Sequence, residues 1–269
     1  MIQMQNNKPV CTENILHITS GEMTANALRE LLPQEEILPF NEAMCEGEVH
    51  IEIFKDEFYR LRAAAYGVEL EDYLQKSPGS FMQNRLKDYP VLYLYFDYDM
   101  FCTVNIITLL AFLEQSGYSG RIKFHLLEAD GSVAILDTWP VLLGIYEKCY
   151  CRVLLKRQRF ITGNELFDKG IELYLEYKKR NNRIIRYIKA HSMEEQKHLV
   201  RDLVLKFADY GLTDIAAARF ITACRDEKRI YYKQKLRSVV NDEKTNYDLY
   251  FDGCHGFGDL RCSIGSRSW

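Results

Sequence analysis

The chain has 269 residues, of which 47% are hydrophobic and 27% charged, and its formal net charge is -3 at pH 7. This length allows two domains or one large domain with a real core, and the composition is that of an ordinary globular protein. The near-neutral balance argues against a protein that coats nucleic acid, but it leaves room for a local basic face. No apolar run approaches the roughly 18 residues of a membrane span, and residues 1–14 lack the plan of a signal peptide. We therefore expect a cytoplasmic protein that does not associate with a membrane.

The stretch 15–28 begins as a short apolar run, turns at Ser20-Gly21 and continues at once as a helical pattern. This predicts the strand, tight turn and helix N-terminus that open an α/β sheet, in which ligands bind where strands end and helices begin. Residues 37–40 form a second short strand, and Pro39 favours an edge or strand-end position because proline has no N–H for the ladder.

A helical pattern runs from His50 to Gly67, and residues 68–88 are predicted as one or two short helices broken at 77–79. The run 91–96 is continuously apolar and aromatic, which indicates a strand of a parallel sheet covered on both faces. A helix is predicted over 101–116, followed by a strand over 121–127. The order of elements implies a four-stranded, mostly parallel, Rossmann-like sheet with right-handed crossovers.

After residue 131 the pattern changes to successive amphipathic helices. They are predicted over 142–150, 164–180, 184–190, 194–210, 214–223 and 227–240, with Asn164 and Thr213 as N-caps and Gly211 as a C-cap. We expect a polar leader (1–14), an α/β domain (15–131), an all-α helical domain (132–250) and a loosely ordered tail (251–269).

Four short motifs occur along the chain: His17 with Gly21-Glu22, Thr24-Ala25 and Leu28; residues 41–47; residues 95–101 with Asn105; and Trp139 with residues 210–213. Together they resemble the opening motif, the second block, the third block and the helical half of a bacterial family called domain of unknown function 1835. The resemblance spans most of residues 15–220 and implies an α/β fold with a site, but no known activity. Glu22, Asn41, Cys102 and Thr103 depart from the family's usual residues, which weakens a site that relies on those side chains.

Acidic residues follow the predicted strand ends, namely Glu22, Glu42, Glu46, Asp97 and Asp99. If the strands are parallel, these carboxylates converge on one rim of the sheet. Such a cluster binds Mg²⁺ or raises one pKa to give a general base. The alternative, which we favour, is that they are the solvated acids of ordinary polar loops.

The turn at residues 19–24 offers free backbone N–H groups to an anion, but it has neither the three-glycine dinucleotide fingerprint nor a Walker loop. Glu22 at the helix N-terminus repels a phosphate, and no Lys or Arg lies nearby in sequence. A ligand here is therefore gripped through ribose hydroxyls, an amine or a metal, and the alternative is a simple acidic helix terminus. His17 and His125 lie inside strands, where a buried core histidine and an acid–base pair are both open interpretations.

The leading hypothesis is a nucleotide- or nucleoside-like small molecule bound at the carboxyl ends of the strands. Candidate ligand-binding residues are Ser20, Gly21, Thr24, Asn41, Glu42 and Asp97, and candidates for acid–base chemistry are Glu22, Asp99 and His17. The sequence decides neither whether the protein is an enzyme nor its cofactor or oligomeric state.

Basic clusters at 178–189 and 225–237 support a second hypothesis, a regulatory or scaffolding module that binds nucleic acid or a protein partner through its helical half. Acids are mixed into both clusters, which favours a solvated surface. A protein-interaction domain without chemistry is the third hypothesis. The tail carries Cys254, His255 and Cys262, whose spacing favours unrelated thiols over a zinc site, so no metal site is predicted.

Overall fold

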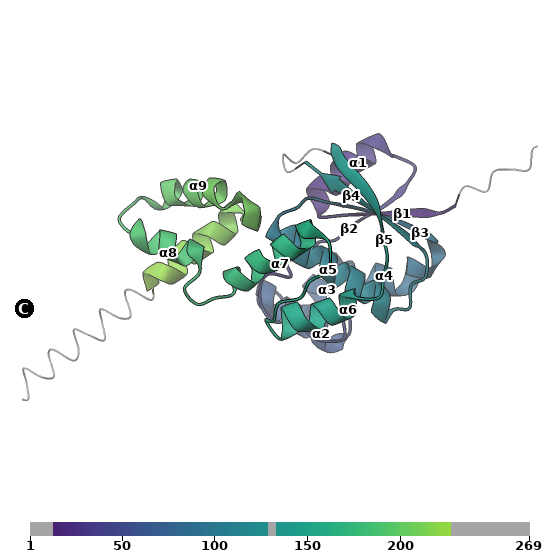
Figure 1. Cartoon of the computed structure of the whole chain (residues 1–269), viewed down its shortest axis with the longest axis horizontal. Coiled ribbons are helices and arrows are strands. Elements are labelled where there is room, and N and C mark those ends of the chain that lie inside the picture. Colours follow the sequence, from purple (N-terminus) through teal and green to yellow (C-terminus); the bar gives the residue numbers. More distant parts are fainter. Residues whose placement is uncertain (1–12, 129–132, 227–269) are drawn as a thin grey trace, which may run out of the picture. The chain divides into compact units, whose positions relative to one another are not determined.

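The computed structural model describes residues 13–128 and 133–226. A five-stranded sheet forms its centre, in the order β2-β1-β3-β4-β5 (Figure 1). The strands are β1 (Ile15–Thr19), β2 (Glu36–Pro39), β3 (Val91–Phe96), β4 (Arg121–Leu127) and β5 (Ile135–Val141). The first four pair in parallel and β5 pairs antiparallel with β4. The predicted α/β class with a small, mostly parallel sheet is confirmed.

The two faces of the sheet carry different layers (Figure 1). Helix α1 (Glu22–Leu31) covers one face, where Ala25 and Leu28 pack with Tyr95 and Leu127 in one apolar cluster. The opposite layer contains α5 (Met100–Gln115), which is buried along nearly its whole length. An evenly apolar helix of this kind lies inside a protein rather than on its surface.

Strand β5 corrects the four-stranded expectation. It begins after residue 131, where only helices were expected, and its register places Phe124 opposite Trp139 and His125 opposite Thr138. Most of its side chains are exposed. An edge strand needs no buried stripe and tolerates Pro140, so its sequence carries no strong strand pattern. The expected boundary near residue 131 therefore does not separate the strands from the helices.

Two helices begin later than the sequence predicted. Helix α2 (Asp56–Tyr66) starts six residues after His50, and Phe54 before it has a φ of 57°, which a helix does not allow. Helix α6 (Tyr146–Tyr150) starts after residue 145 and continues as a π-helical turn (Cys151–Leu155). Residues 68–88 do form short helices, α3 (Leu70–Lys76) and α4 (Gly79–Arg85), with a 3₁₀ turn (Leu86–Asp88).

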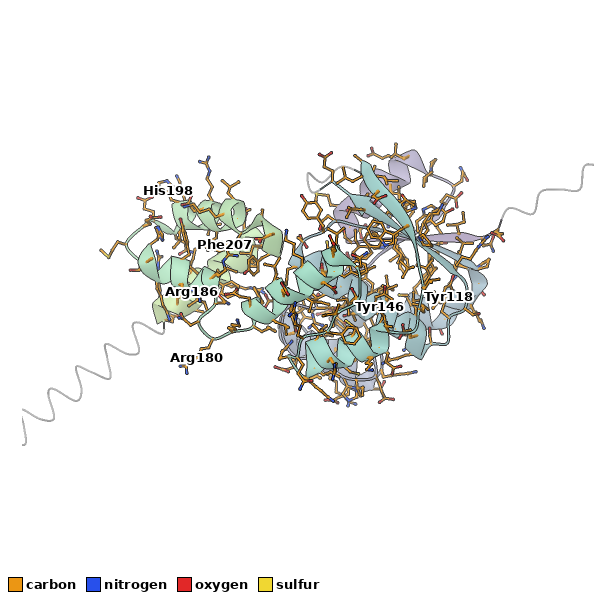
Figure 2. The ribbon with its side chains drawn as sticks, viewed as in Figure 1. Tyr118, Tyr146, Arg180, Arg186, His198 and Phe207 are labelled. Atoms are coloured by element: carbon orange, nitrogen blue, oxygen red, sulfur yellow. The ribbon has the colours of Figure 1, made fainter. Side chains whose placement is uncertain are left out.

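The helical half contains α7 (Glu165–Tyr177), α8 (Arg183–Ala190), α9 (Gln196–Lys206) and a 3₁₀ turn (Ala208–Tyr210). Asn164 accepts hydrogen bonds from Leu166 N and Phe167 N, so the predicted N-cap is confirmed. Gly211 ends the 3₁₀ turn with a φ of 67°, as a C-cap glycine does. Phe207, labelled in Figure 2, packs against Tyr187 of α8.

Contacts divide the chain after Ala218 into two compact units, and the sheet and helices α1–α9 belong to the first. A further helix begins at Asp214 and continues to the end of the described residues. The leader through residue 12, the helix predicted at 227–240, the basic residues beyond 226 and the tail cysteines lie outside the described residues. Within the part that is described, no helix has both the length and the apolar character that a membrane crossing requires.

Candidate functional site

The order of the strands reverses at β1, which has β2 on one side and β3 on the other. In open α/β sheets the crevice at such a switch point, outside the carboxyl ends of the strands, is where ligands bind. Ser20 follows β1 there, and Asp97 follows β3. The two strand ends are joined directly, because Ser20 N donates a hydrogen bond to Tyr95 O at 2.9 Å.

The Ser20-Gly21 turn is tied back to the first turn of α1. Thr19 Oγ1 donates to Gly21 O at 3.0 Å, and the hydroxyls of Ser20 and Thr24 lie 3.2 Å apart. Gly21 is the N-cap residue of α1, and it offers no side chain to the first backbone N–H groups of the helix. These N–H groups are therefore the donors that this end of the sheet can offer to a ligand.

Glu22 and Asn41 meet on the outer rim of the same turn. Asn41 Nδ2 donates to Glu22 Oε2 at 3.4 Å, and Arg29 Nη1 donates to Glu22 Oε1 at 2.7 Å. The hydrogen bond from Arg29 is the main cause that lowers the pKa of Glu22. Glu22 is thus held ionised, which suits an acceptor for hydroxyl groups better than a general base.

The sequence alone did not show that Arg29, two turns further along the same face of α1, neutralises this carboxylate.

Asp97 and Asp99 form the inner part of the rim. Asp99 is the N-cap residue of α5, where its Oδ1 accepts from Cys102 N at 2.6 Å, and Asp97 Oδ1 accepts from Asp99 N at 3.1 Å. Burial, followed by the charge of Asp97, raises the pKa of Asp99 to about 7. Two neighbouring carboxyl groups of which one keeps its proton near neutrality can take and return a proton.

Gly211, which belongs to the helical half, lies directly against the Asp99 carboxyl group. A Cβ atom at Gly211 would overlap Asp99 Oδ2 and press on Phe101. Only a glycine in the left-handed conformation lets the backbone come this close. The sequence predicts a C-cap role for Gly211 but not its contact with Asp99, because residues so far apart in the chain give no local signal of their contact.

Glu42, expected on the rim, lies instead in the core with a relative exposure of 2%. Arg62 Nε donates to Glu42 Oε2 at 3.3 Å, the Tyr73 hydroxyl donates to the other oxygen, and Arg62 Nη2 donates to Ala43 O at 2.8 Å. Burial raises the pKa of Glu42, and the Arg62 guanidinium opposes that rise. This carboxylate fixes the loop after β2 and is not accessible to a ligand.

His17 also lies away from the rim, on the face of the sheet that α1 covers. Its Nδ1 is 3.0 Å from the Tyr95 hydroxyl, and Tyr95 stacks between the rings of His17 and His125. Burial lowers the pKa of both histidines. The pair is thus joined through one tyrosine as a buried, neutral stack, and it does not reach the turn at Ser20.

Asp97, Asp99 and Cys102 each offer one potential metal-ligand atom, and these atoms lie within 4.8 Å of one another. The donor set fits a cation poorly. Mg²⁺ and Ca²⁺ prefer oxygen ligands alone, and Zn²⁺ needs a thiolate. Burial raises the pKa of the Cys102 thiol well above its ordinary value, which adds to the cost of forming the thiolate that Zn²⁺ would need. The cluster is better suited to proton transfer than to metal binding.

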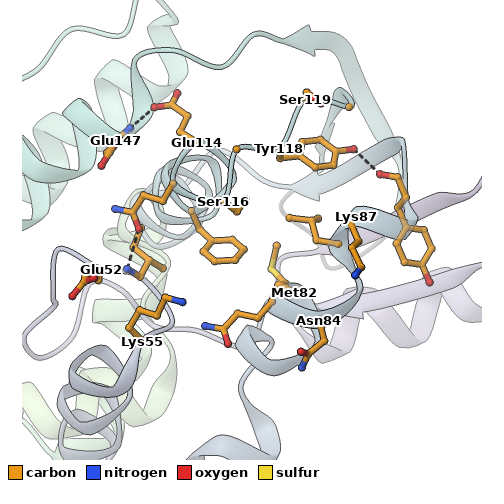
Figure 3. Close-up of a pocket in the computed structure, with 18 of the residues that line it drawn as sticks. Glu52, Lys55, Met82, Asn84, Lys87, Glu114, Ser116, Tyr118, Ser119 and Glu147 are labelled. Atoms are coloured by element: carbon orange, nitrogen blue, oxygen red, sulfur yellow. Dashed lines mark hydrogen bonds between the residues drawn. The ribbon is translucent and has the colours of Figure 1, made fainter.

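A groove of about 1280 Å³ lies at the opposite, amino-terminal edge of the sheet, beside Pro90 and Gly120 (Figure 3). Met82 and Phe112 form part of its buried lining, and Lys55 and Lys87 lie at its border. Several of its polar groups already hold the fold together: Glu114 accepts from Tyr146 N and Glu147 N at 2.9 and 2.7 Å, Gln115 bonds Ile51 O and Ile53 N, and Tyr118 donates to Tyr89 O. The carboxyl edge remains the better candidate for a ligand site.

No protein-family model, curated protein or solved structure matches this chain. The resemblance to domain of unknown function 1835 therefore stays a prediction drawn from short motifs. The case for a site at the carboxyl edge comes from the geometry of the strand ends.

Proposed function

We propose that the chain binds a nucleoside- or nucleotide-like small molecule at the carboxyl ends of β1 and β3. One observation carries the proposal: the Ser20-Gly21 turn and the Asp97–Asp99 pair follow the ends of two neighbouring parallel strands at the switch point of the sheet, and the pKa of Asp99 is raised to about 7. Perturbed carboxyl groups at such a position are typical of functional sites.

The ligand chemistry follows from the charges on the rim. Glu22 and Asp97 are acceptors for ribose hydroxyls or an amine, the backbone N–H groups of α1 are donors, and Asp99 is the group suited to hold or release a proton. Thr24 supports the turn through Ser20 rather than facing a ligand directly. If the protein is an enzyme, Asp99 is the residue that we assign to acid–base chemistry.

The helical half offers less support for a nucleic-acid interface. Lys178 donates to Cys45 O at 2.9 Å, and Arg186 lies 3.7 Å from Glu176. These basic side chains of the first cluster are engaged within the protein, while most of the second cluster lies outside the described residues.

Thermal unfolding of the full chain with the four common ribonucleosides tests this proposal without involving a phosphate. A nucleoside at a hundred times its dissociation constant adds about 2.7 kcal/mol to the free energy of unfolding. We expect this gain to disappear in Asp97→Asn and to persist in Glu30→Gln, a charge change on the exposed side of α1. If no nucleoside stabilises the chain, or if Asp97→Asn keeps the full gain, the strand-end rim is not the site.

A further inference from the structure

Two cationic side chains share the ring of Tyr174, which lies on α7. The guanidinium carbon of Arg157 is 5.1 Å from the ring centroid, and Lys178 Nζ is 5.8 Å from it. Arg157 follows the π-helical turn, and Lys178 is the C-cap residue of α7. The fold therefore gathers two positive charges at one side chain from separate segments of the chain.

Among the described residues, neither charge has an ion-pair partner. Within residues 13–128 and 133–226, no carboxylate oxygen lies within 4.0 Å of either side chain, and Lys178 Nζ donates to the carbonyl of Cys45 instead. Burial lowers the pKa of both groups, and the charge of Arg157 lowers the pKa of Lys178 further. The carboxylates of Glu46 and Glu48 oppose the shift at Lys178, and Glu48 opposes the shift at Arg157, but neither acid lies within 4.0 Å of these side chains.

Two polar groups of these same side chains are buried. Arg157 Nη1 and the Tyr174 hydroxyl have no hydrogen-bond partner among the described residues, and the Tyr174 side chain has a relative exposure of 0%. Buried donors without acceptors are unfavourable and rare in native proteins. A negatively charged hydrogen-bond acceptor would satisfy these donors and the two positive charges beside them.

We propose that Arg157, Tyr174 and Lys178 form a binding site for an oxyanion, namely a phosphate group. Arg157 and Lys178 are partly exposed as whole residues, although Arg157 Nη1 itself is buried. The oxygens of one phosphate group accept hydrogen bonds from the guanidinium, the ammonium and the phenol. The negative charge of the phosphate balances the two positive charges. This proposal stands apart from the strand-end site, because none of its residues belongs to the rim.

Calorimetric titration of the full chain with inorganic phosphate, at constant ionic strength maintained with sodium chloride, tests this proposal. We expect Arg157→Met and Lys178→Met to raise the dissociation constant by about ten- to a hundredfold, the range of a lost charged hydrogen bond. Lys169→Met removes one charge from the exposed side of the same helix and should leave the constant unchanged.

Tyr174→Phe keeps the proposal testable if a charge variant fails to fold. It removes a hydroxyl that has no partner in the described part of the chain, so the unliganded protein should be at least as stable as the wild type, while phosphate binds several-fold more weakly. Asp97→Asn should bind phosphate as the wild type does, which separates this site from the proposed nucleoside site.

Ribose 5-phosphate in place of phosphate tells a free anion from the phosphoryl group of a larger ligand. Tighter binding that still depends on Arg157 indicates a phosphorylated metabolite, and equal binding indicates the free ion. The proposal is overturned if phosphate does not bind more tightly than chloride, or if Arg157→Met and Tyr174→Phe both bind it as well as Lys169→Met does.

Discussion

At the scale of single residues, Asp99 combines two roles whose demands conflict. As the N-cap of α5 it must accept a hydrogen bond from Cys102 N, which favours a carboxylate or an amide oxygen. As a partly buried neighbour of Asp97 it resists ionisation, and its pKa rises to about 7. The fold therefore carries an acid at a position where an uncharged cap of the same shape would be more stable.

Replacing Asp99 with Asn should stabilise the protein at neutral and alkaline pH. The unfolded state ionises near 3.8 and the folded state only near 7, so wild-type stability falls as pH rises between these values. Asn keeps the cap without the charge, and we expect a gain of about 1–3 kcal/mol at pH 8 that vanishes near pH 4. Urea unfolding across this range measures it.

Asp72→Asn, at an exposed position of α3, is the matched control and should show no such pH-dependent gain. A loss of stability in Asp99→Asn at pH 8 would contradict the raised pKa.

The buried pair of Glu42 and Arg62 leads to a second prediction. Arg62→Met leaves a carboxylate without its partner in a site that is 2% exposed, and such a change costs about 3–5 kcal/mol. Adding Glu42→Gln to this variant should recover part of the loss, since the uncompensated charge is gone. Guanidinium unfolding of the single and double variants measures both effects.

Arg60→Met provides the comparison on the same helix. Arg60 pairs with Glu57 at the surface, where an ion pair contributes about 0–1 kcal/mol. Similar losses in Arg60→Met and Arg62→Met would show that the buried pair has no special role.

At the scale of elements, the turns that end helices determine how closely those helices approach their neighbours. Gly117 and Gly211 both adopt a left-handed conformation, with φ of 68° and 67°. A Cβ atom at Gly117 would meet open space, whereas at Gly211 it would overlap the Asp99 carboxyl group. The left-handed conformation at Gly117 therefore serves only to end a helix, whereas at Gly211 it also allows close contact with Asp99.

Gly211→Ala should thus cost more than Gly117→Ala. Both variants carry the penalty of about 1 kcal/mol for a left-handed alanine. Gly211→Ala adds a steric overlap worth about 1–3 kcal/mol and displaces the Asp99 side chain. Equal losses of unfolding free energy in the two variants would show that the helical half does not press on the strand-end rim.

At the scale of the whole first unit, α5 joins the sheet to the helical half. It packs against the sheet and against α7, where a Cβ atom at Gly170 would overlap the Thr103 side chain. Trp139 of β5 stacks on Phe124 with ring centroids 4.7 Å apart, and Phe124 in turn contacts Phe167 of α7. Strands and helices thus share one core.

We expect the sheet and the helices to unfold in a single transition. In a Trp269→Phe background, Trp139 fluorescence reports the sheet and far-ultraviolet circular dichroism reports the helices, and their midpoints should coincide. Gly170→Ala should lower the free energy of unfolding by about 1–3 kcal/mol and move both midpoints down together, although alanine favours a helix over glycine. Lys169→Ala, on the exposed side of α7, should move neither, and separate midpoints would mean that α7 folds independently of the sheet.

Local patterns were enough to predict the parallel strands and the helix ends. The apolar runs at 15–19 and 91–96 and the ends at Gly67, Gly117 and Gly211 agree with the structure, because burial on both faces and left-handed glycines leave a direct mark on the sequence. Strand β5 left no such mark, because its pairing with β4 is decided by one edge of the sheet and not by its own side chains.

The features around the strand-end rim also fall into those that the sequence predicts and those that it does not. That Ser20, Asp97 and Asp99 follow the ends of parallel strands could be predicted from the order of elements. Tertiary structure alone decided that Glu42 pairs with Arg62 in the core, that Gly211 closes over Asp99, and that Arg157 and Lys178 share one ring. Sequence determines which residues end an element, whereas charge pairing and burial depend on distances between segments far apart in the chain.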